Sequence, residues 1–292
     1  MTGAIRYPLR FQIGARTLFS VRRTLARVAF DLPMLLADAH LELPALPDDA
    51  DGFVLTSWPE TRIAGVQGAF VRQRYTRYHA DFGNGFEAYL AHFSARSRNA
   101  INRKRKRFPA DAVRCYRTPA EMEAFVALAR PVSRASYQHR LLDAGLPDTP
   151  AARAEMLALA AADKVRAFLL FRDEQAIAYL YLPVQDDVLI YAYLGHDPQF
   201  GDLSPGTVLQ IEAIRILAEE GRYTRLDFTE GEGQHKRMFA TGGIACADVL
   251  LLRPTLANRA MLGALRMFDG TVARGKTLSR HPAFGWLKAL RR

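Results

Sequence analysis

The sequence predicts an α+β fold with a central mixed, mainly antiparallel sheet. Three apolar runs rich in β-branched and aromatic residues follow one another at 165–171, 176–184 and 188–194, and the polar turns between them predict an antiparallel meander. A strongly amphipathic helix is predicted directly afterwards, over residues 203–221. With 292 residues, 49% hydrophobic and 24% charged, the chain can bury a core, which excludes disordered and collagen-like proteins.

Strands and helices alternate through the rest of the chain. Strand patterns occur at 7–13, 17–32, 69–82, 113–117, 225–228 and 247–252, and a short apolar run occurs at 52–58. Helical patterns occur at 86–93, 94–107, 119–128, 133–142, 151–162 and from Leu256 onward. Ser94 and Thr118 are suitable N-caps for two of these helices. The order predicts interleaved elements rather than separate all-α and all-β parts.

Positive charge is concentrated in three segments. Residues 1–30 hold six arginines and no acid, residues 96–107 hold seven bases and no acid, and residues 255–292 hold eight bases against Asp269. The net charge is +10, so the remainder of the chain is acidic. Such patches indicate an anionic ligand or surface, which could be nucleic acid, the phosphates of a cofactor or an anionic membrane.

A helix start suited to an anion follows the meander. Ser204 is suitable as an N-cap, Pro205 as the first helical residue, and Gly206 leaves the backbone uncovered before Thr207. Unpaired N–H groups and the partial positive charge of a helix start suit a phosphate or pyrophosphate. A well-capped helix without a ligand explains the same residues, so both interpretations stay open.

The loop at 227–236 combines three acids, two glycines, His235 and Lys236 after a short buried strand. A carboxylate such as Glu230, or the imidazole, could take a proton from an attacking amine, and Lys236 could offset phosphate charge. An exposed turn with mutually paired charges is the alternative. Loops between core elements are nevertheless where a scaffold places functional groups.

Two further segments have a functional and a structural interpretation. The basic helix at 94–107 suits a phosphate-facing surface, or it is a solvated basic face. In the segment 133–139, Tyr137 could protonate a leaving thiolate, or it is a tyrosine at the border of the core.

The sequence lacks the motifs of several enzyme and metal-site classes. The sequence has no Walker A loop, dinucleotide glycine pattern, zinc-protease motif, paired-cysteine metal spacing or serine nucleophile elbow. We therefore expect no metal. Its two cysteines fit a reducing compartment. No apolar run approaches the roughly 18 residues of a spanning helix, and residues 1–14 lack the apolar centre of a signal peptide. A cytoplasmic protein is expected.

Four stretches carry a family resemblance. They are 97–104 with Arg98, 133–138 with Tyr137, Tyr-Leu-Gly-His-Asp-Pro at 193–198 leading to Ser-Pro-Gly at 204–206, and Asp-Phe-x-x-Gly at 227–231 before His235-Lys236. Together they resemble the BioF2-like, cellulose-biosynthesis-type branch of the GNAT acyltransferases, close to the FemAB-like peptidyltransferases. The resemblance covers about residues 70–252. Ser-Pro-Gly-Thr stands where ordinary GNAT enzymes carry Q/R-x-x-G-x-G/A, and His235 where many relatives carry tyrosine.

The resemblance implies a tandem of two GNAT-like halves. It places a degenerate N-terminal half at 1–130, an acyltransferase half at 131–253 and a basic helical tail at 254–292. It also implies transfer of an acyl group, in the first place acetyl, from acyl-CoA to an amine or similar nucleophile of a small molecule or glycan, as in polysaccharide or cell-envelope metabolism. The residues implied in catalysis are Glu230, His235, Asp227 and Tyr137. Those implied in holding the acyl-CoA are Tyr193, Leu194, Ser204, Gly206, Thr207, Lys236 and Arg98.

Three rival functions stay open. The first is a FemAB-type transferase that draws on aminoacyl-tRNA, with the basic segments on the RNA backbone, whereas the acyl-CoA-dependent function implies no nucleic acid. The second is a non-catalytic protein that binds an anionic glycan or nucleic acid. The third is peripheral membrane contact through 255–292. The apolar residues that accompany the bases of this tail are Leu262, Leu265, Phe268, Trp286 and Leu287.

Overall fold

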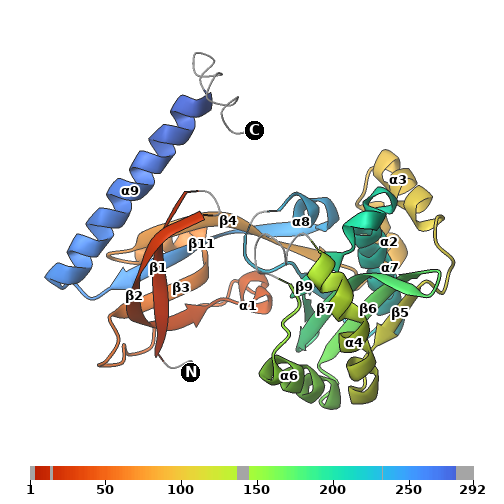
Figure 1. Ribbon diagram of the computed structural model, residues 1–292. Coiled ribbons are helices and arrows are strands. Elements are labelled where there is room, and N and C mark those ends of the chain that lie inside the picture. Colours follow the sequence, from red (N-terminus) through yellow and green to blue (C-terminus); the bar gives the residue numbers. More distant parts are fainter. Residues whose placement is uncertain (1–3, 14–15, 137–144, 232, 281–292) are drawn as a thin grey trace. The chain divides into compact units, whose positions relative to one another are not determined.

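The protein divides into two compact units, and Figure 1 labels most of their helices and strands. The structure is a computed structural model that describes residues 4–13, 16–136, 145–231 and 233–280. Unit 1 is Met1–Tyr75 with Ala245–Arg292, and unit 2 is Thr76–Ile244. The boundaries predicted from the sequence, after residues 130 and 253, differ from this division. The first of them lies inside a continuous helix, α4 (Pro119–Ala135).

Unit 1 is a sheet with one long helix. Its strand order is β1-β2-β3-β11-β4. The β1/β2 and β3/β11 pairs are antiparallel, whereas β2 and β3 are parallel. The elements are β1 (Ala4–Ile13), β2 (Arg16–Ala29), α1 (Leu32–Leu36), β3 (Gly52–Pro59), a 3-10 turn (Glu60–Gly65), β4 (Phe70–Asp81), β11 (Gly242–Leu252) and α9 (Leu256–Arg280). The division between the units falls within β4 and β11.

The basic tail uses part of its apolar side for packing within unit 1. Leu265 is fully buried against Leu9 and Phe11, and Leu262 and Phe268 pack on the same cluster. Three of the five apolar residues named for membrane contact therefore have a structural role in α9, and the other two lie outside the described residues. Within the described ranges, every helix is too short or too polar to cross a bilayer.

Unit 2 contains the predicted meander, which the structure confirms. The strand order is β4-β10-β8-β7-β6-β5, and β9 pairs with β7. The strands are β5 (Val113–Tyr116), β6 (Val165–Arg172), β7 (Gln175–Gln185), β8 (Val188–Ile190), β9 (Tyr193–His196) and β10 (Arg225–Asp227). The helices are α2 (Phe86–Ala91), α3 (Ala95–Arg105), α4, α6 (Pro150–Ala161), α7 (Pro205–Glu220) and α8 (Gln234–Phe239). The α+β class and the mixed, mainly antiparallel sheet are confirmed.

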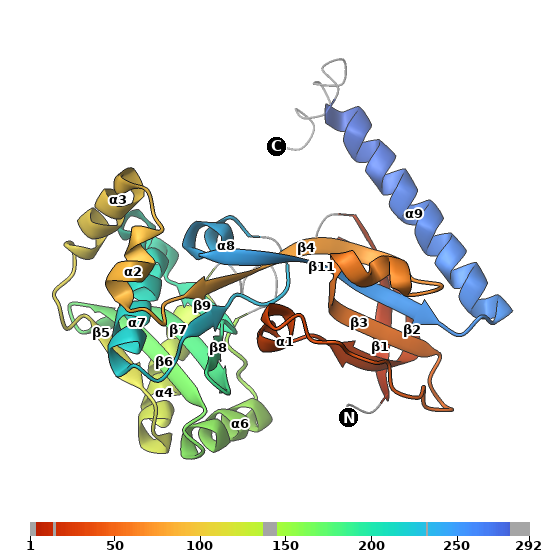
Figure 2. The ribbon, with the colours of Figure 1, turned by 180° about the vertical axis from the view of Figure 1, so that it is seen from behind.

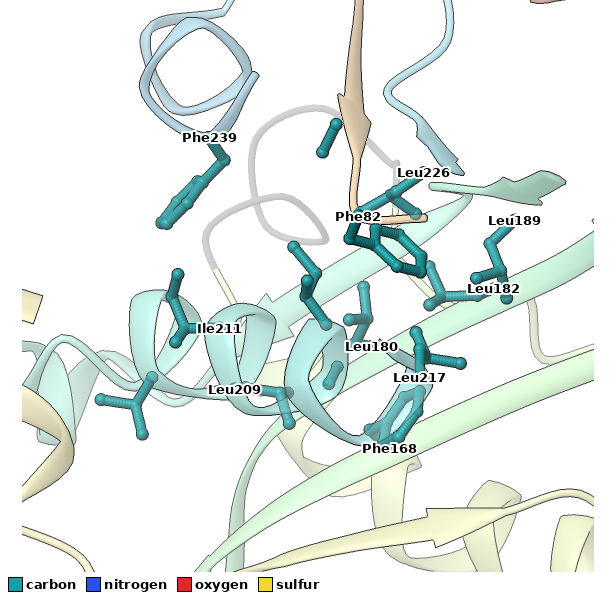
Figure 3. Close-up of a cluster of buried hydrophobic side chains, with 14 of the residues drawn as sticks. Phe82, Phe168, Leu180, Leu182, Leu189, Leu209, Ile211, Leu217, Leu226 and Phe239 are labelled. Carbon is teal, nitrogen blue, oxygen red and sulfur yellow. The ribbon is translucent and has the colours of Figure 1, made fainter. Parts of the chain in front are cut away.

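The central strands β6 and β7 are buried on both faces because helices cover both sides, as Figures 1 and 2 show. Successive strand residues point to opposite faces. One set packs with α7 in the cluster of Figure 3, including Phe168, Leu180 and Leu182. The alternate set, including Leu169 and Tyr181, packs with α4 and α6. Helices α2 and α3 pack against α7.

The helix α4 differs from the prediction, which ended it at residue 128 and began another at 133. It continues through Pro131 to Ala135. Proline removes one helical hydrogen bond, but Ala129, Val132 and Ser133 are buried. Packing of this last turn against the sheet therefore outweighs the local cost of the proline.

Candidate functional site

Two neighbouring strands of unit 2 separate at Tyr191. Strand β8 pairs with β7 on one side and β10 on the other, and the pairing with β10 ends at Ile190 and Asp227. The Tyr191 N–H donates to Asp227 O at 2.9 Å, after which the Phe228 N–H donates to Tyr78 O of β4 instead. Strand β9 pairs with β7, and no described strand pairs with its other edge.

A β-bulge lies where the strands separate. Val184 pairs with Leu189, and Tyr181 pairs with Tyr193, so the strand opposite β7 holds one extra residue. The Ala192 N–H also donates to Tyr181 O, at 3.3 Å. Such an insertion bends a strand and redirects its groups.

The unpaired edge of β9 presents backbone hydrogen-bonding groups. Asp197 N–H donates to Ile177 O of β7 at 2.9 Å, and hydrogen bonding in an antiparallel pair alternates along the strand. The backbone N–H and C=O groups of Leu194 and His196 therefore face away from β7. They are available to an extended ligand on this edge.

The start of α7 exposes one backbone amide. Pro205 is the first helical residue, as predicted, and Ser204 is at the N-cap position. The Ser204 side chain makes no capping bond, because its backbone is left-handed (φ 54°, ψ 50°). Thr207 and Val208 donate their N–H groups to Ser204 O at 3.0 and 3.2 Å. Within the part of the chain that the structure describes, the Gly206 N–H has no such partner.

The strand edge, the start of α7 and helix α8 enclose a pocket of about 460 Å³. Six residues predicted from the sequence line it: Tyr193, Leu194, Ser204, Gly206, Thr207 and His235. They come from three separate elements, and the fold brings them together in unit 2.

Residues 95–237 match the family model described as an acetyltransferase (GNAT) domain. These residues carry a GNAT domain. The GNAT part of the predicted resemblance is thus confirmed, with the GNAT-like fold, and the domain supports acyltransferase activity. The narrower BioF2-like assignment stays a prediction.

Two solved structures share this fold. FemX has a TM-score of 0.54 at 10% identity, with 89% of this chain and 91% of FemX covered. The C-terminal domain (DUF2156) of a proposed lysylphosphatidylglycerol synthetase from Agrobacterium fabrum has a TM-score of 0.50 at 11% identity, with 76% and 72% covered. No curated protein sequence matches the chain.

Two imidazoles face the pocket of the GNAT domain. Partial burial lowers the pKa of His235, and the Lys236 ammonium lowers it further. Burial also lowers the pKa of His196, against the opposing effect of Asp197. The ring of His235 lies 5.9 Å from that of Tyr191 between centroids. Both imidazoles are therefore predominantly neutral at neutral pH, the form that accepts a proton.

The remaining predicted catalytic residues lie elsewhere. Asp227 is fully buried, and its carboxylate accepts hydrogen bonds from the Arg77 guanidinium, at 2.5 to 3.2 Å, and from the Thr229 N–H, at 2.8 Å. Its geometry is that of a buried ion pair that fixes a turn. Glu230 is in the following loop and does not line the pocket. Tyr137 lies outside the described residues.

Two predicted cofactor-binding cations contact carbonyls of the chain itself. The Lys236 ammonium donates to Glu230 O at 2.6 Å and to Gly231 O at 3.3 Å, so it closes the loop before α8. Arg98 donates to Phe93 O at 2.5 Å. Neither side chain lines the pocket.

The basic helix α3 borders a second depression of about 690 Å³ in the GNAT domain. Besides apolar residues, its lining comprises the polar and charged residues Asn99, Asn102, Arg103, Arg105, Lys106 and Glu212. Arg105 pairs with Glu212 of α7 at 2.5 Å, so part of the basic face holds α3 on the fold. Among the described residues, no cluster of acidic, histidine or cysteine side chains is arranged for a metal ion.

Sequence reasoning missed three polar residues of the pocket, which are Tyr191, His196 and Gln210. Gln210 had one usable signal, because it is a polar residue between the apolar Leu209 and Ile211 of an amphipathic helix. Tyr191 had none, because the bulge that redirects the strand there has no sequence signature.

Proposed function

We propose that the protein is an acyltransferase that moves an acyl group from acyl-CoA to an amine of a small molecule or glycan. Acetyl is the acyl group we propose. The GNAT domain at 95–237 supports the reaction class. The single observation that carries the proposal is the pocket that joins a bare helix start, an open strand edge and a neutral imidazole.

The binding half of the proposal assigns two roles to backbone groups. The Gly206 N–H and the positive end of α7 hold the pyrophosphate, which suits a helix start. The free backbone groups of Leu194 and His196 bind the amides of the pantetheine arm, much as a neighbouring strand would. This directs the thioester along β9 into the pocket.

The chemical half assigns the proton to His235. The acceptor nitrogen attacks the thioester carbonyl carbon, so a C–N bond forms and the C–S bond breaks. Neutral His235 takes the proton that the amine loses. The departing thiolate takes a proton from Tyr137, the donor proposed from the sequence, or from water. No covalent acyl-enzyme is required, and Glu230 is the alternative base.

The binding half is tested by calorimetry of the full chain with acetyl-CoA. A Cβ at position 206 would lie 3.3 Å from Leu194 Cδ2 and 3.9 Å from His196 Nδ1, so Gly206→Val extends into the pocket. We expect its Kd to rise at least about tenfold, a loss of about 1.4 kcal/mol. Gly263→Val in α9 is the matched control, because among the described residues no atom beyond its chain neighbours and the adjacent helix backbone lies within 4 Å of the added Cβ. Equal affinities for Gly206→Val and wild type would remove the pyrophosphate assignment.

The base is tested by the pH dependence of kcat/KM. The lowered pKa of His235 makes the rate rise with pH through an inflection below the ordinary value of about 6.5. The His235→Gln variant should lose this inflection together with most activity, and His40→Gln, at an exposed residue of unit 1, should keep both. An unchanged profile in His235→Gln would transfer the role to Glu230, to be checked with Glu230→Gln.

A FemAB-type transferase that uses aminoacyl-tRNA is the second candidate. The fold shared with FemX and the basic depression beside α3 favour it. Aminoacyl-tRNA binding whose affinity falls steeply with salt, together with no calorimetric signal from acyl-CoA, would select it. If neither donor changes the thermal stability of the protein, a non-catalytic binding role replaces both.

A further inference from the structure

A buried side-chain amide inside the GNAT domain has no partner. Gln210 is 1% exposed, and its Nε2 makes no hydrogen bond to any described residue. Buried N–H groups are nearly always paired, because an unpaired one loses its bonds to water without replacement. In a residue that lines a pocket, such a donor is a candidate for a hydrogen bond to a ligand.

Gln210 is one of the residues that line the pocket of the proposed donor. Gln210 follows Gly206 by four residues on α7, so both lie on one face of the helix, about 6 Å apart along its axis. Tyr191, His235 and Phe239 line the same pocket. Figure 3 shows Phe239 over the turns of α7 that carry Leu209 and Ile211.

We propose that the Nε2 of Gln210 donates a hydrogen bond to the carbonyl oxygen of the acyl group that is transferred. The inference rests on the proposed function: with the pyrophosphate at Gly206 and the base at His235, the reacting carbonyl lies deeper in the pocket than the helix start. That oxygen gains negative charge as the amine adds to the carbonyl carbon. A fixed N–H donor stabilises this charge best in an apolar, partly dry site.

Glutamine is suited to this role because its side chain is uncharged. It donates at every pH at which the protein is folded, without competing with His235 for a proton. It also adds no positive charge that would raise the cost of protonating His235 during the reaction. In this role Gln210 is a catalytic residue, because its side chain contacts the reacting carbonyl group directly.

The test compares acetyl-CoA with CoA, which differ only in the acyl group. Calorimetry of wild type and of Gln210→Met, which keeps the length but removes the donor, measures the ratio of the two dissociation constants. We expect at least a tenfold weaker affinity for acetyl-CoA, less than a twofold change for CoA, and a fall in kcat of about 100-fold. Gln199→Met, at an exposed position of the preceding 3-10 turn, is the matched control and should behave as wild type.

Other results of the calorimetry would refute either the role of Gln210 or the proposed function itself. An equal loss for both ligands would assign Gln210 to the shared part of CoA or to packing, and no change would leave it without a role; either result refutes the inference. If wild type binds neither ligand, the proposed function itself fails. Should Gln210→Met not fold, Gln210→Glu keeps the size and replaces the donor by an acceptor, so it should show the same selective loss.

Discussion

The buried ion pair between Arg77 and Asp227 offers a quantitative test of the fold around the site. Asp227 has no exposed surface, and the Arg77 side chain is 7% exposed. The same carboxylate accepts the Thr229 N–H at 2.8 Å, where Thr229 has a positive φ of 60°. A β-branched residue rarely adopts this conformation, so the carboxylate helps to hold the turn that leads to His235.

The perturbation is Asp227→Asn. Asparagine keeps an oxygen for the Thr229 N–H but leaves the guanidinium of Arg77 buried without its counter-charge. Removing one partner of a buried pair costs about 3–5 kcal/mol. For a unit of this size each kcal/mol lowers Tm by about 2–4 °C, which gives a fall of about 6–20 °C. Urea titration followed by circular dichroism measures the free energy of unfolding, and calorimetry measures Tm.

A double variant separates the charge from the shape. Arg77→Met combined with Asp227→Asn removes both charges, so it should cost clearly less than the sum of the two single substitutions. The reasoning is refuted if Asp227→Asn costs less than about 1 kcal/mol, or if the two single costs add without coupling.

Three further substitutions, the last with a matched control on the same helix, test local features, each by its free energy of unfolding. Gly195→Ala should cost about 1–3 kcal/mol because its Cβ would lie 2.5 Å from Cε1 of the buried Tyr179 ring; a neutral effect would contradict the close approach. Thr118→Ala should cost about 1 kcal/mol, since it removes the capping box that opens α4, and an unchanged midpoint would mean the cap is redundant. Leu265→Ala, at a fully buried position of α9, should cost about 2–5 kcal/mol. Met267→Ala, 77% exposed on the same helix, should be nearly neutral, and equal costs would disprove the packing of α9.

Much of the fold follows from patterns within single segments. The meander, the helix start at Pro205 and the basic helix α3 are each encoded by nearby residues, so periodicity and capping rules find them. The same local chemistry identified Gly206 and His235, which the fold brings to one pocket. The extent of α4 was misjudged because burial of its last turn, not the local effect of Pro131, decides where it ends.

The parts that sequence could not supply depend on distant partners. The role of Asp227 depends on Arg77, which is 150 residues away in the chain, so its carboxylate looked free to act. Gln210 is recognisable as unusual, but only the packed structure shows that its amide has no partner. A single sequence contains no direct record of either relationship.

The extra residue at Ala192 separates two halves of what would otherwise be one uniform strand. Because side chains and backbone groups alternate with a period of two, deleting that residue would turn everything from Tyr193 to His196 inside out. The groups now offered to a ligand would point at β7, and the buried ones would meet solvent. The inserted residue thus sets the register of β9 relative to β8, and with it the direction in which the backbone groups of β9 face.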